Sequence, residues 1–325
     1  MIKPPSILKN PFVQSFLASK AFPFCEIDSL PSNLYIVDGG KNVRLVSYVS
    51  KIEEKKAKGV WIILHGWGGS SDSAYVVRSA QFFYQQGYDI VRLNFRDHGN
   101  THGMNRDPFN GTLLEEAYQA VLQISLMYKN TPVYLLGFSL GGNFALRIAI
   151  RHSISKEKIY NLQYCFAISP SINPKAATEK IDSHFFLKKS FLSDWIDSLQ
   201  KKRKHFPNLF DAKMLKSSQS VMELTEQLVL QCTNYTSLDE YFSKYTLTGN
   251  AFQKLSIPSI IITSLDDPVV PAKDFAKIKA NKNLHFFIRE YGGHNGFFLS
   301  WNLQPWYNPF LLSIITSGRN LSDFL

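Results

Sequence analysis

The stretch VYLLGFSLGGNFALRIAI, residues 133–150, decides the fold that we expect for this chain. It begins with branched apolar residues, one serine then stands between glycines, and a helical pattern of apolar residues follows. This order predicts a buried strand that turns sharply into a helix. The pentapeptide GFSLG, residues 137–141, fits G-x-S-x-G, in which side chains two residues on either side of the serine would collide. We therefore predict that Ser139 is exposed on a strained turn as a nucleophile, above the free N–H groups of the helix.

Strand-like and helix-like segments alternate along most of the chain. The strands that we expect cover residues 34–37, 43–49, 60–64, 89–94, 133–138, 164–169, 260–263 and 285–290. The helices that we expect cover residues 72–86, 113–128, 140–152, 272–280 and part of 305–317, and Thr112 with Glu115 is expected to form a capping box. The first two strands flank the turn DGGKN and so predict an antiparallel hairpin. The fold class is therefore α/β, a doubly wound and mostly parallel eight-stranded sheet.

The alternation breaks between residues 171 and 254, where the sequence has no good strand pattern. We expect residues 1–170 and 255–325 to form the core and residues 171–254 to form an inserted helical cap. In the cap, Phe185, Leu192, Trp195 and Ile196 share one helical face, which predicts an apolar stripe that turns inward. Whether this stripe lines an acyl site or only packs on the core stays open.

A serine hydroxyl needs a histidine to take its proton, and that histidine needs a carboxylate to orient it. In this type of sheet the expected chain order is serine, acid, histidine. His294 lies in YGGHNGF, just after the last strand, whereas His285 lies at the opposite end of that strand. The acid is expected after the strand at 260–263, where either Asp266 or Asp267 fits.

The loop after the third strand reads His65-Gly66-Trp67-Gly68-Gly69-Ser70, and its glycines allow the backbone to approach a substrate oxygen closely. We predict an oxyanion hole made by the backbone N–H groups of Trp67 and Leu140. His65 is interpreted as a structural residue of this loop. The polar loop NFRDHGNTHG, residues 94–103, is expected to brace its neighbours by hydrogen bonds and to hold no metal.

Composition excludes several classes of protein. The 325 residues are 45% apolar and 19% charged, which is enough apolar content for a large core and argues against disorder. The net charge of +10 is scattered rather than gathered in a basic stripe, so we expect no nucleic-acid partner. No run of about 18 apolar residues predicts a transmembrane helix, although peripheral contact with a membrane stays open. We see no secretory signal, and three separated cysteines, Cys25, Cys165 and Cys232, suit a reducing, cytoplasmic location.

At this point the sequence resembles the α/β-hydrolases and, more narrowly, their YheT-like branch. The matching stretches are PPSILKNPFVQS, HGWGGSSDSAYVVRSAQFFYQQGYDIVRLNFRDHG, GFSLGGN, DDPVVP and GGHNGF, which cover most of the chain outside the cap. In such proteins the acid commonly lies four residues before the proline that opens the next helix, which here implies Asp267 ahead of Pro271. Trp67 departs from the leucine that relatives often carry, and the cap matches weakly, so the substrate is not carried over.

The resemblance implies a carboxylesterase, lipase or thioesterase type of activity on a small acyl ester, without a cofactor. In the expected mechanism Ser139, Asp267 and His294 form a catalytic triad and an acyl-enzyme is the intermediate. An acyltransferase, perhydrolase or peptidase on the same triad is one alternative, and a non-catalytic binding protein that keeps the fold is another. The sequence does not indicate the acyl length or the oligomeric state.

Overall fold

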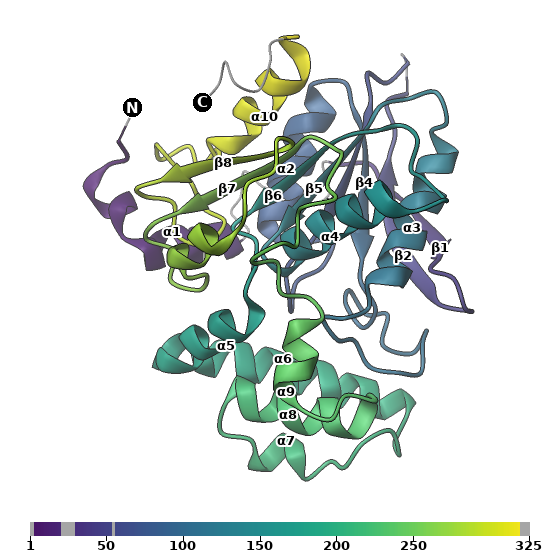
Figure 1. Ribbon diagram of the computed structural model, residues 1–325, viewed down its shortest axis with the longest axis vertical. Helices are drawn as coiled ribbons and strands as arrows, with labels where there is room; N and C mark the ends of the chain where they lie inside the picture. The colour runs from purple at the N-terminus through teal and green to yellow at the C-terminus, as the bar shows by residue number, and fades with distance from the viewer. Residues whose placement is uncertain (1–2, 21–29, 54–55, 319–325) are drawn as a thin grey trace.

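The computed structural model describes residues 3–20, 30–53 and 56–318. An eight-stranded sheet crosses the molecule in the order β1-β2-β4-β3-β5-β6-β7-β8 (Figure 1). β2 pairs antiparallel with β1 and with β4, and the other neighbouring strands pair in parallel. The prediction of a mostly parallel sheet with an antiparallel start is therefore confirmed. The strands are β1 (Asn33–Asp38), β2 (Arg44–Ser50), β3 (Val60–Leu64), β4 (Asp89–Asn94), β5 (Val133–Phe138), β6 (Leu162–Ile168), β7 (Ser259–Ser264) and β8 (Leu284–Arg289).

Four strands away from the edges of the sheet, β3, β4, β5 and β7, are buried along their whole length. Their runs of Val, Ile and Leu suit this position, because such strands contact helices on both faces of the sheet. Cys165, in β6, is fully buried as expected, and Cys232 is partly buried. Cys25 lies outside the described residues.

Helices cover both faces of the sheet and make three layers. One face packs against α3 and α4, and the other packs against α2 and α10. These helices are α2 (Ala74–Gln85), α3 (Leu114–Met127), α4 (Leu140–Ile154) and α10 (Tyr307–Thr316). All four lie where the sequence pattern predicted a helix, so the doubly wound α/β class is confirmed.

Two predicted helix features differ from the structure. The expected capping box is absent, because Asn110 Oδ1 accepts from both Thr112 Oγ1 (2.6 Å) and Thr112 N (3.0 Å), and α3 begins only at Leu114 with Leu113 as its N-cap. The segment expected as a helix over 272–280 is the short 3₁₀ helix η3 (Ala272–Lys277). Side chains three residues apart eclipse in a 3₁₀ helix, and Lys277 Nζ accordingly lies 2.5 Å from Asp274 Oδ1.

The N-terminal segment forms two helices that we did not predict, η1 (Ser6–Lys9) and α1 (Pro11–Ser19). Asn10 begins α1, since its side chain accepts from Phe12 N at 2.9 Å and Val13 N at 3.2 Å, and Pro11 occupies the first helical position. Gln14, fully buried on α1, donates to Phe298 O (2.9 Å) and accepts from Phe298 N (2.9 Å). This pair of hydrogen bonds fixes α1 to the chain segment that follows β8.

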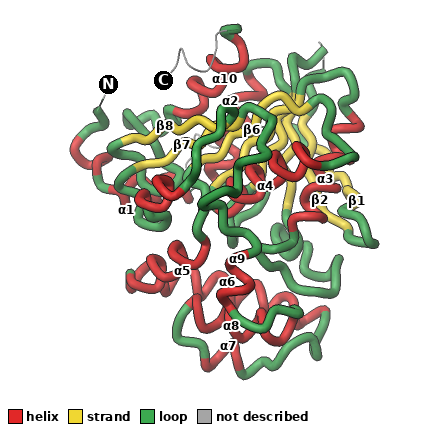
Figure 2. Tube along the Cα trace, viewed as in Figure 1, coloured by secondary structure: helices red, strands yellow, loops and turns green. Residues whose placement is uncertain are grey.

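Five helices lie between β6 and β7 in the chain, and they gather on one side of the molecule away from the sheet (Figures 1 and 2). They have a small apolar interior of their own, which includes Leu199, Met214, Leu224 and Leu228. Because they follow the carboxyl end of β6, they lie near the carboxyl ends of the parallel strands, where Ser139 is also placed. The five are α5 (Pro174–Ser183), α6 (Phe185–His205), α7 (Met214–Ser217), α8 (Val221–Cys232) and α9 (Leu238–Ser243).

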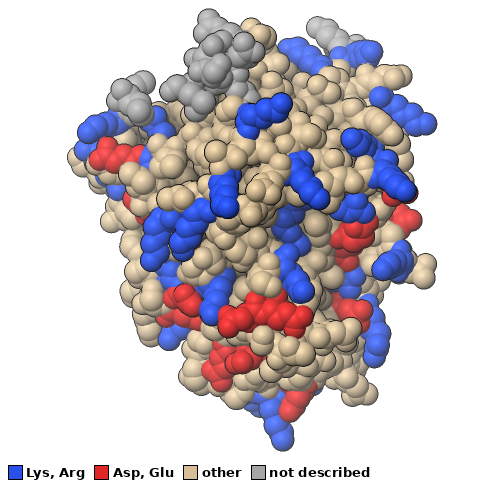
Figure 3. Space-filling model, in the orientation of Figure 1, with Lys and Arg blue, Asp and Glu red and all other residues tan. Residues whose placement is uncertain are grey.

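Lys and Arg side chains are spread over the visible face in Figure 3 rather than gathered in one stripe, and most of the visible Asp and Glu side chains lie on its lower half. Among the described helices, none combines the length and the apolar character that crossing a membrane requires.

Candidate active site

Ser139 stands at the junction of β5 and α4 in a strained backbone conformation, with φ of 52° and ψ of −117°. Non-glycine residues rarely adopt positive φ, and such strain is often found at functional positions. A Cβ atom at Gly137 would lie 2.2 Å from Gly141 O, and one at Gly141 would lie 2.3 Å from His65 O. Both glycines are therefore required by close backbone contacts, as the sequence predicted, and the turn has no room to relax.

His294 and Asp267 lie side by side in the loops that follow the carboxyl ends of β8 and β7. His294 Nδ1 is 2.9 Å from Asp267 Oδ2 and 3.1 Å from Oδ1. Asp267 is only 1% exposed, and its Oδ1 also accepts from Val269 N (2.8 Å) and Val270 N (2.9 Å). These amide donors hold the carboxylate in place, so it presents a fixed acceptor to the imidazole and leaves Nε2 free for another partner.

Asp266 has a different set of partners from its neighbour. Its Oδ1 accepts from Gly292 N at 3.1 Å and from Gly293 N at 2.9 Å, and burial raises its pKa. Asp266 therefore shapes the loop that carries His294, whereas Asp267 contacts the imidazole itself.

Residues of α1 hold the same histidine loop from outside the sheet. Ser15 Oγ accepts from His294 N at 2.8 Å, and a Cβ at Gly293 would lie 2.5 Å from Pro11 O. Sequence reasoning missed these contacts, although Asn10-Pro11 is a usable helix-start signal. That α1 packs against a loop almost 280 residues later in the chain has no signal in a single sequence.

The loop that carries Trp67 is braced by two buried histidines. His65 Nδ1 donates to Gly66 O (2.7 Å) while its Nε2 accepts from Phe95 N (3.1 Å). His98 Nδ1 donates to Arg96 O (2.7 Å) and its Nε2 accepts from Gly68 N (3.3 Å). Burial holds the pKa of His65 well below its ordinary value and lowers that of His98 to about 4. Both rings are therefore neutral braces, which agrees with the predicted structural role of His65 and of the 94–103 loop.

Two adjoining cavities open beside Ser139. We call the first the inner pocket, which is lined mainly by apolar side chains, several of them from α6, α8 and α9, among them Trp67, Phe109, Phe191, Trp195, Leu228 and Phe242. We call the second the outer cleft, and Ser139, His294 and Tyr75 line it together with Phe12 and Phe16 of α1. Ser139 and His294 thus face the same cleft, and Ser139 also faces the inner pocket.

The two predicted oxyanion donors lie close to Ser139 in the chain or in space. Leu140 is the first residue of α4, so its N–H is one of those that a helix leaves without an intrahelical acceptor. Trp67 lines both cavities beside Ser139, and a Cβ at the preceding Gly66 would lie 3.2 Å from Ser139 Cβ. The Gly66 N–H itself donates to Tyr75 Oη at 3.0 Å.

Comparisons with known proteins agree with this architecture. Phospholipase ABHD3 from Bos taurus is 22% identical over 276 residues, which cover 81% of this chain and 65% of that protein. A monoacylglycerol lipase from Saccharomyces cerevisiae is 25% identical over 300 residues, 87% of this chain and 65% of that protein. The chain thus spans about 65% of the length of each of these relatives.

A solved structure gives the same result for the fold. An esterase from Pyrococcus furiosus aligns with 98% of this chain and 97% of its own, with a TM-score of 0.59 and 15% sequence identity. The family model described as alpha/beta hydrolase fold matches residues 60–300, from β3 to beyond the loop of His294. The sheet order, the strained serine turn and this match lead to one conclusion, which is that the chain belongs to the α/β-hydrolase fold family.

Proposed function

We propose that this protein is a serine hydrolase that cleaves carboxylic ester or thioester bonds through an acyl-enzyme. The observation that carries the proposal is the arrangement around Ser139. The serine occupies a strained turn and shares a cleft with His294, and His294 is hydrogen-bonded to the buried carboxylate of Asp267. Two relatives are named as a phospholipase and a monoacylglycerol lipase, which supports an ester of lipid type as the substrate.

In the proposed mechanism, Ser139 Oγ attacks the carbonyl carbon of the substrate while His294 Nε2 takes its proton. Asp267 keeps the other ring proton on Nδ1 and stabilises the imidazolium. The negative oxygen of the tetrahedral intermediate accepts hydrogen bonds from the N–H groups of Trp67 and Leu140. When the intermediate collapses, the bond to the leaving alcohol or thiol breaks and His294 returns the proton to it.

Water completes the cycle on the acyl-enzyme. His294 takes one proton from the water as its oxygen attacks the ester carbon on Ser139. The second tetrahedral intermediate then releases the carboxylic acid, and Ser139 Oγ recovers its proton from His294. The balance requires only the ester and water, so the side chains named here suffice for the reaction.

We further propose that residues 171–254 act as a cap over this site, and that the acyl chain lies in the inner pocket. Apolar side chains from α6, α8 and α9 meet core residues there, which suits a hydrocarbon chain more than a polar group. The outer cleft reaches polar groups of α1 and α6, and we assign it to the leaving alcohol. The N-terminal stretch at residues 4–15 supports a placement in the YheT-like branch.

The test is ester hydrolysis by the wild type and by Ser139→Ala, measured with p-nitrophenyl esters of increasing acyl length. We expect Ser139→Ala to lower kcat by about 10⁴-fold or more, because no other hydroxyl replaces the nucleophile. Thermal melting of both proteins serves as the control for folding. Retention of more than a tenth of the wild-type turnover by a folded Ser139→Ala variant would contradict the proposal.

A further inference from the structure

We propose that Lys202, on the cap helix α6, is a positioning residue that holds the oxyanion loop in place through the β4–α3 loop, residues 95–113. This inference rests on the proposed function, since it assigns a role at the same site. It makes the cap part of the machinery that prepares the oxyanion hole, in addition to being a wall of the acyl pocket.

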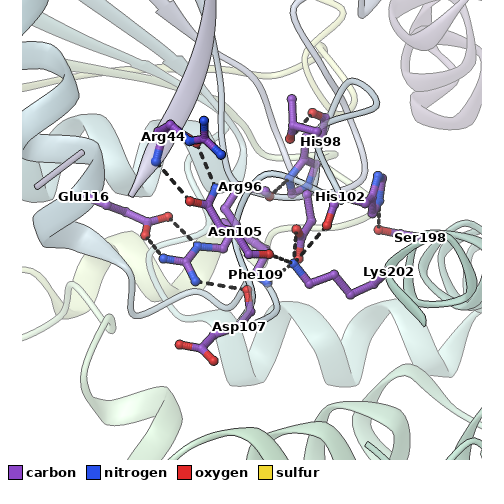
Figure 4. Close-up of polar contacts among 12 residues, drawn as sticks. Arg44, Arg96, His98, His102, Asn105, Asp107, Phe109, Glu116, Ser198 and Lys202 are labelled. Atoms are coloured by element: carbon purple, nitrogen blue, oxygen red, sulfur yellow. Dashed lines mark hydrogen bonds and ion pairs between the residues drawn. The ribbon is translucent and has the colours of Figure 1, made fainter. Parts of the chain in front are cut away.

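The Lys202 side chain is fully buried where α6 meets the β4–α3 loop (Figure 4). Its Nζ lies 2.8 Å from Asp97 Oδ1 and also donates to two loop carbonyls, His102 O at 3.2 Å and Asn105 O at 2.5 Å. An ammonium group has three donors, and these three acceptors satisfy them all. A buried lysine that uses each of its donors on one loop fixes the path of that loop relative to α6.

Asp97 passes this constraint to the oxyanion loop through its neighbour in the chain. Its backbone has φ of 61°, and its second carboxylate oxygen accepts from Phe109 N at 2.8 Å, so the residue is held on both sides. The next residue, His98, accepts from Gly68 N at 3.3 Å. Gly68 directly follows Trp67, whose N–H is a proposed oxyanion donor, so a short chain of contacts joins Lys202 to that donor.

Helix α6 also reaches the oxyanion loop directly. The Trp67 ring packs edge-to-face on Trp195, with the ring centres 4.7 Å apart, and it lies 5.8 Å from the Phe191 ring. His102 Nε2 forms a further hydrogen bond of 2.9 Å with Ser198 Oγ of the same helix (Figure 4). Trp195, Ser198 and Lys202 lie at spacings of three and four residues, which places them on one face of α6.

Other parts of the β4–α3 loop are held by the core without help from the cap. Arg96 pairs with Glu116 of α3 at 2.5 Å and 3.3 Å, and it donates to Asp107 O at 3.0 Å. Asn105 exchanges two hydrogen bonds with the backbone of Arg44 in β2, at 3.0 Å and 2.8 Å (Figure 4). The loop therefore keeps its anchor on the core when Lys202 is removed, and the part that is released is the one beside Asp97 and His98.

The test compares Lys202→Met with Lys201→Met, which removes an exposed charge from the adjacent position on α6. Turnover is measured with a p-nitrophenyl ester and is expressed per active site, counted by complete fluorophosphonate labelling. We expect Lys202→Met to lower kcat at least tenfold with KM changed less than about twofold, because an oxyanion donor acts mainly in the transition state. The affinity for a trifluoromethyl ketone of matching acyl chain should fall by a similar factor. Lys201→Met should match the wild type in both measurements.

A second variant separates positioning from stability. Lys202→Met alone leaves Asp97 buried without its cation, which destabilises the folded state, so we add the double variant Lys202→Met/Asp97→Asn. We expect the double variant to recover the melting temperature while kcat and ketone affinity stay low, since the tie to α6 is still absent. If Lys202→Met does not fold, the double variant alone decides.

Three results would overturn this inference. One is a wild-type kcat in a folded variant without Lys202, and another is a rise in KM alone. The third is recovery of kcat together with the melting temperature in the double variant. If only the inference about Lys202 is wrong, the Ser139→Ala variant is still inactive. Failure of the proposed function instead appears as hydrolysis that survives in Ser139→Ala, so the two failures are distinguishable.

Discussion

The turn at Ser139 and the cap helix α6 both contribute to the candidate site, but they are specified in different ways. At the turn, a Cβ at Gly137 or Gly141 would lie within 2.3 Å of a backbone oxygen, so the requirement for glycine comes from the backbone itself. In α6, the sequence pattern placed Phe185, Leu192, Trp195 and Ile196 on an inward stripe. The structure leaves Phe185 67% exposed, so that part of the prediction is wrong.

Phe185 is the first residue of α6, and the apolar residues that follow it divide between two packing partners. Leu192 and Ile196 pack, with Trp195, on the apolar interior of the cap. Leu187 and Phe191 line the cavities beside Ser139. Trp195 lines the same cavities and also packs on the interior of the cap. Periodicity identifies an apolar face but does not tell which neighbour covers it. Local backbone constraints are therefore predictable from sequence, whereas the choice between two packing partners is a property of the assembled fold.

The largest effect that we expect on folding is at the turn. Gly137→Ala should cost more than about 4 kcal/mol of unfolding free energy, because the added carbon overlaps the backbone of α4 and neither segment can move. Gly249→Ala in the cap is the control, since Gly249 has open space around its Cβ, and its positive φ of 59° is the only cost that the added carbon meets there. That variant should cost about 1–2 kcal/mol for the left-handed backbone alone. Urea denaturation followed by circular dichroism measures the unfolding free energy of both variants. Equal losses in the two would show that the close backbone contacts at Gly137 do not set the requirement for glycine.

The next effect concerns the two adjacent carboxylates. Asp267→Asn should lower kcat by about 10⁴-fold, because an amide in its place no longer holds the imidazole in the required tautomer. Asp266→Asn should lower kcat less than about tenfold, since an amide oxygen can still accept from Gly292 N and Gly293 N. Both variants are assayed on one short-chain ester at the same pH. A larger loss in Asp266→Asn would reverse the two assignments.

The strands of the core and the geometry of the turn were predictable because each depends on nearby residues. The bounds of β3, β4 and β5 agree with the sequence pattern, and Gly137 and Gly141 have the predicted close contacts. The capping box at Thr112 was wrong because the nearby Asn110 competes for the same hydroxyl. This competition is local, but residue preferences do not tell whether the Thr112 hydroxyl bonds to Asn110 or caps the helix.

Long-range contacts explain what was missed. Ser15 reaches His294 N, and Lys202 reaches Asp97, across more than a hundred residues in each case. Lys202 lies in the basic run at residues 201–204, a pattern that usually indicates a solvated surface, yet it is fully buried. Only the assembled fold distinguishes this lysine from the exposed Lys201 beside it.

The smallest effect that we expect is in the cap. Trp195→Ala should lower kcat/KM for long acyl esters relative to acetate esters, because the enlarged pocket contacts fewer methylenes. Each methylene that loses its contact corresponds to about 0.8 kcal/mol, or about fourfold in kcat/KM. Phe186→Ala, at an 83% exposed position of the same helix, is the matched control and should leave the profile unchanged. Parallel profiles for Trp195→Ala and wild type would mean that this side chain only packs.

The most direct test of the central claim, that Ser139 is the nucleophile of an ester hydrolase, is to locate the adduct of a fluorophosphonate by peptide mass spectrometry. We predict one adduct per chain, on Ser139, formed in step with the loss of esterase activity. Labelling should be absent from Ser139→Ala and much slower in Asp267→Asn, where the histidine is poorly oriented. An adduct on another residue that accompanies inactivation, or full inactivation without any adduct on Ser139, would contradict the account.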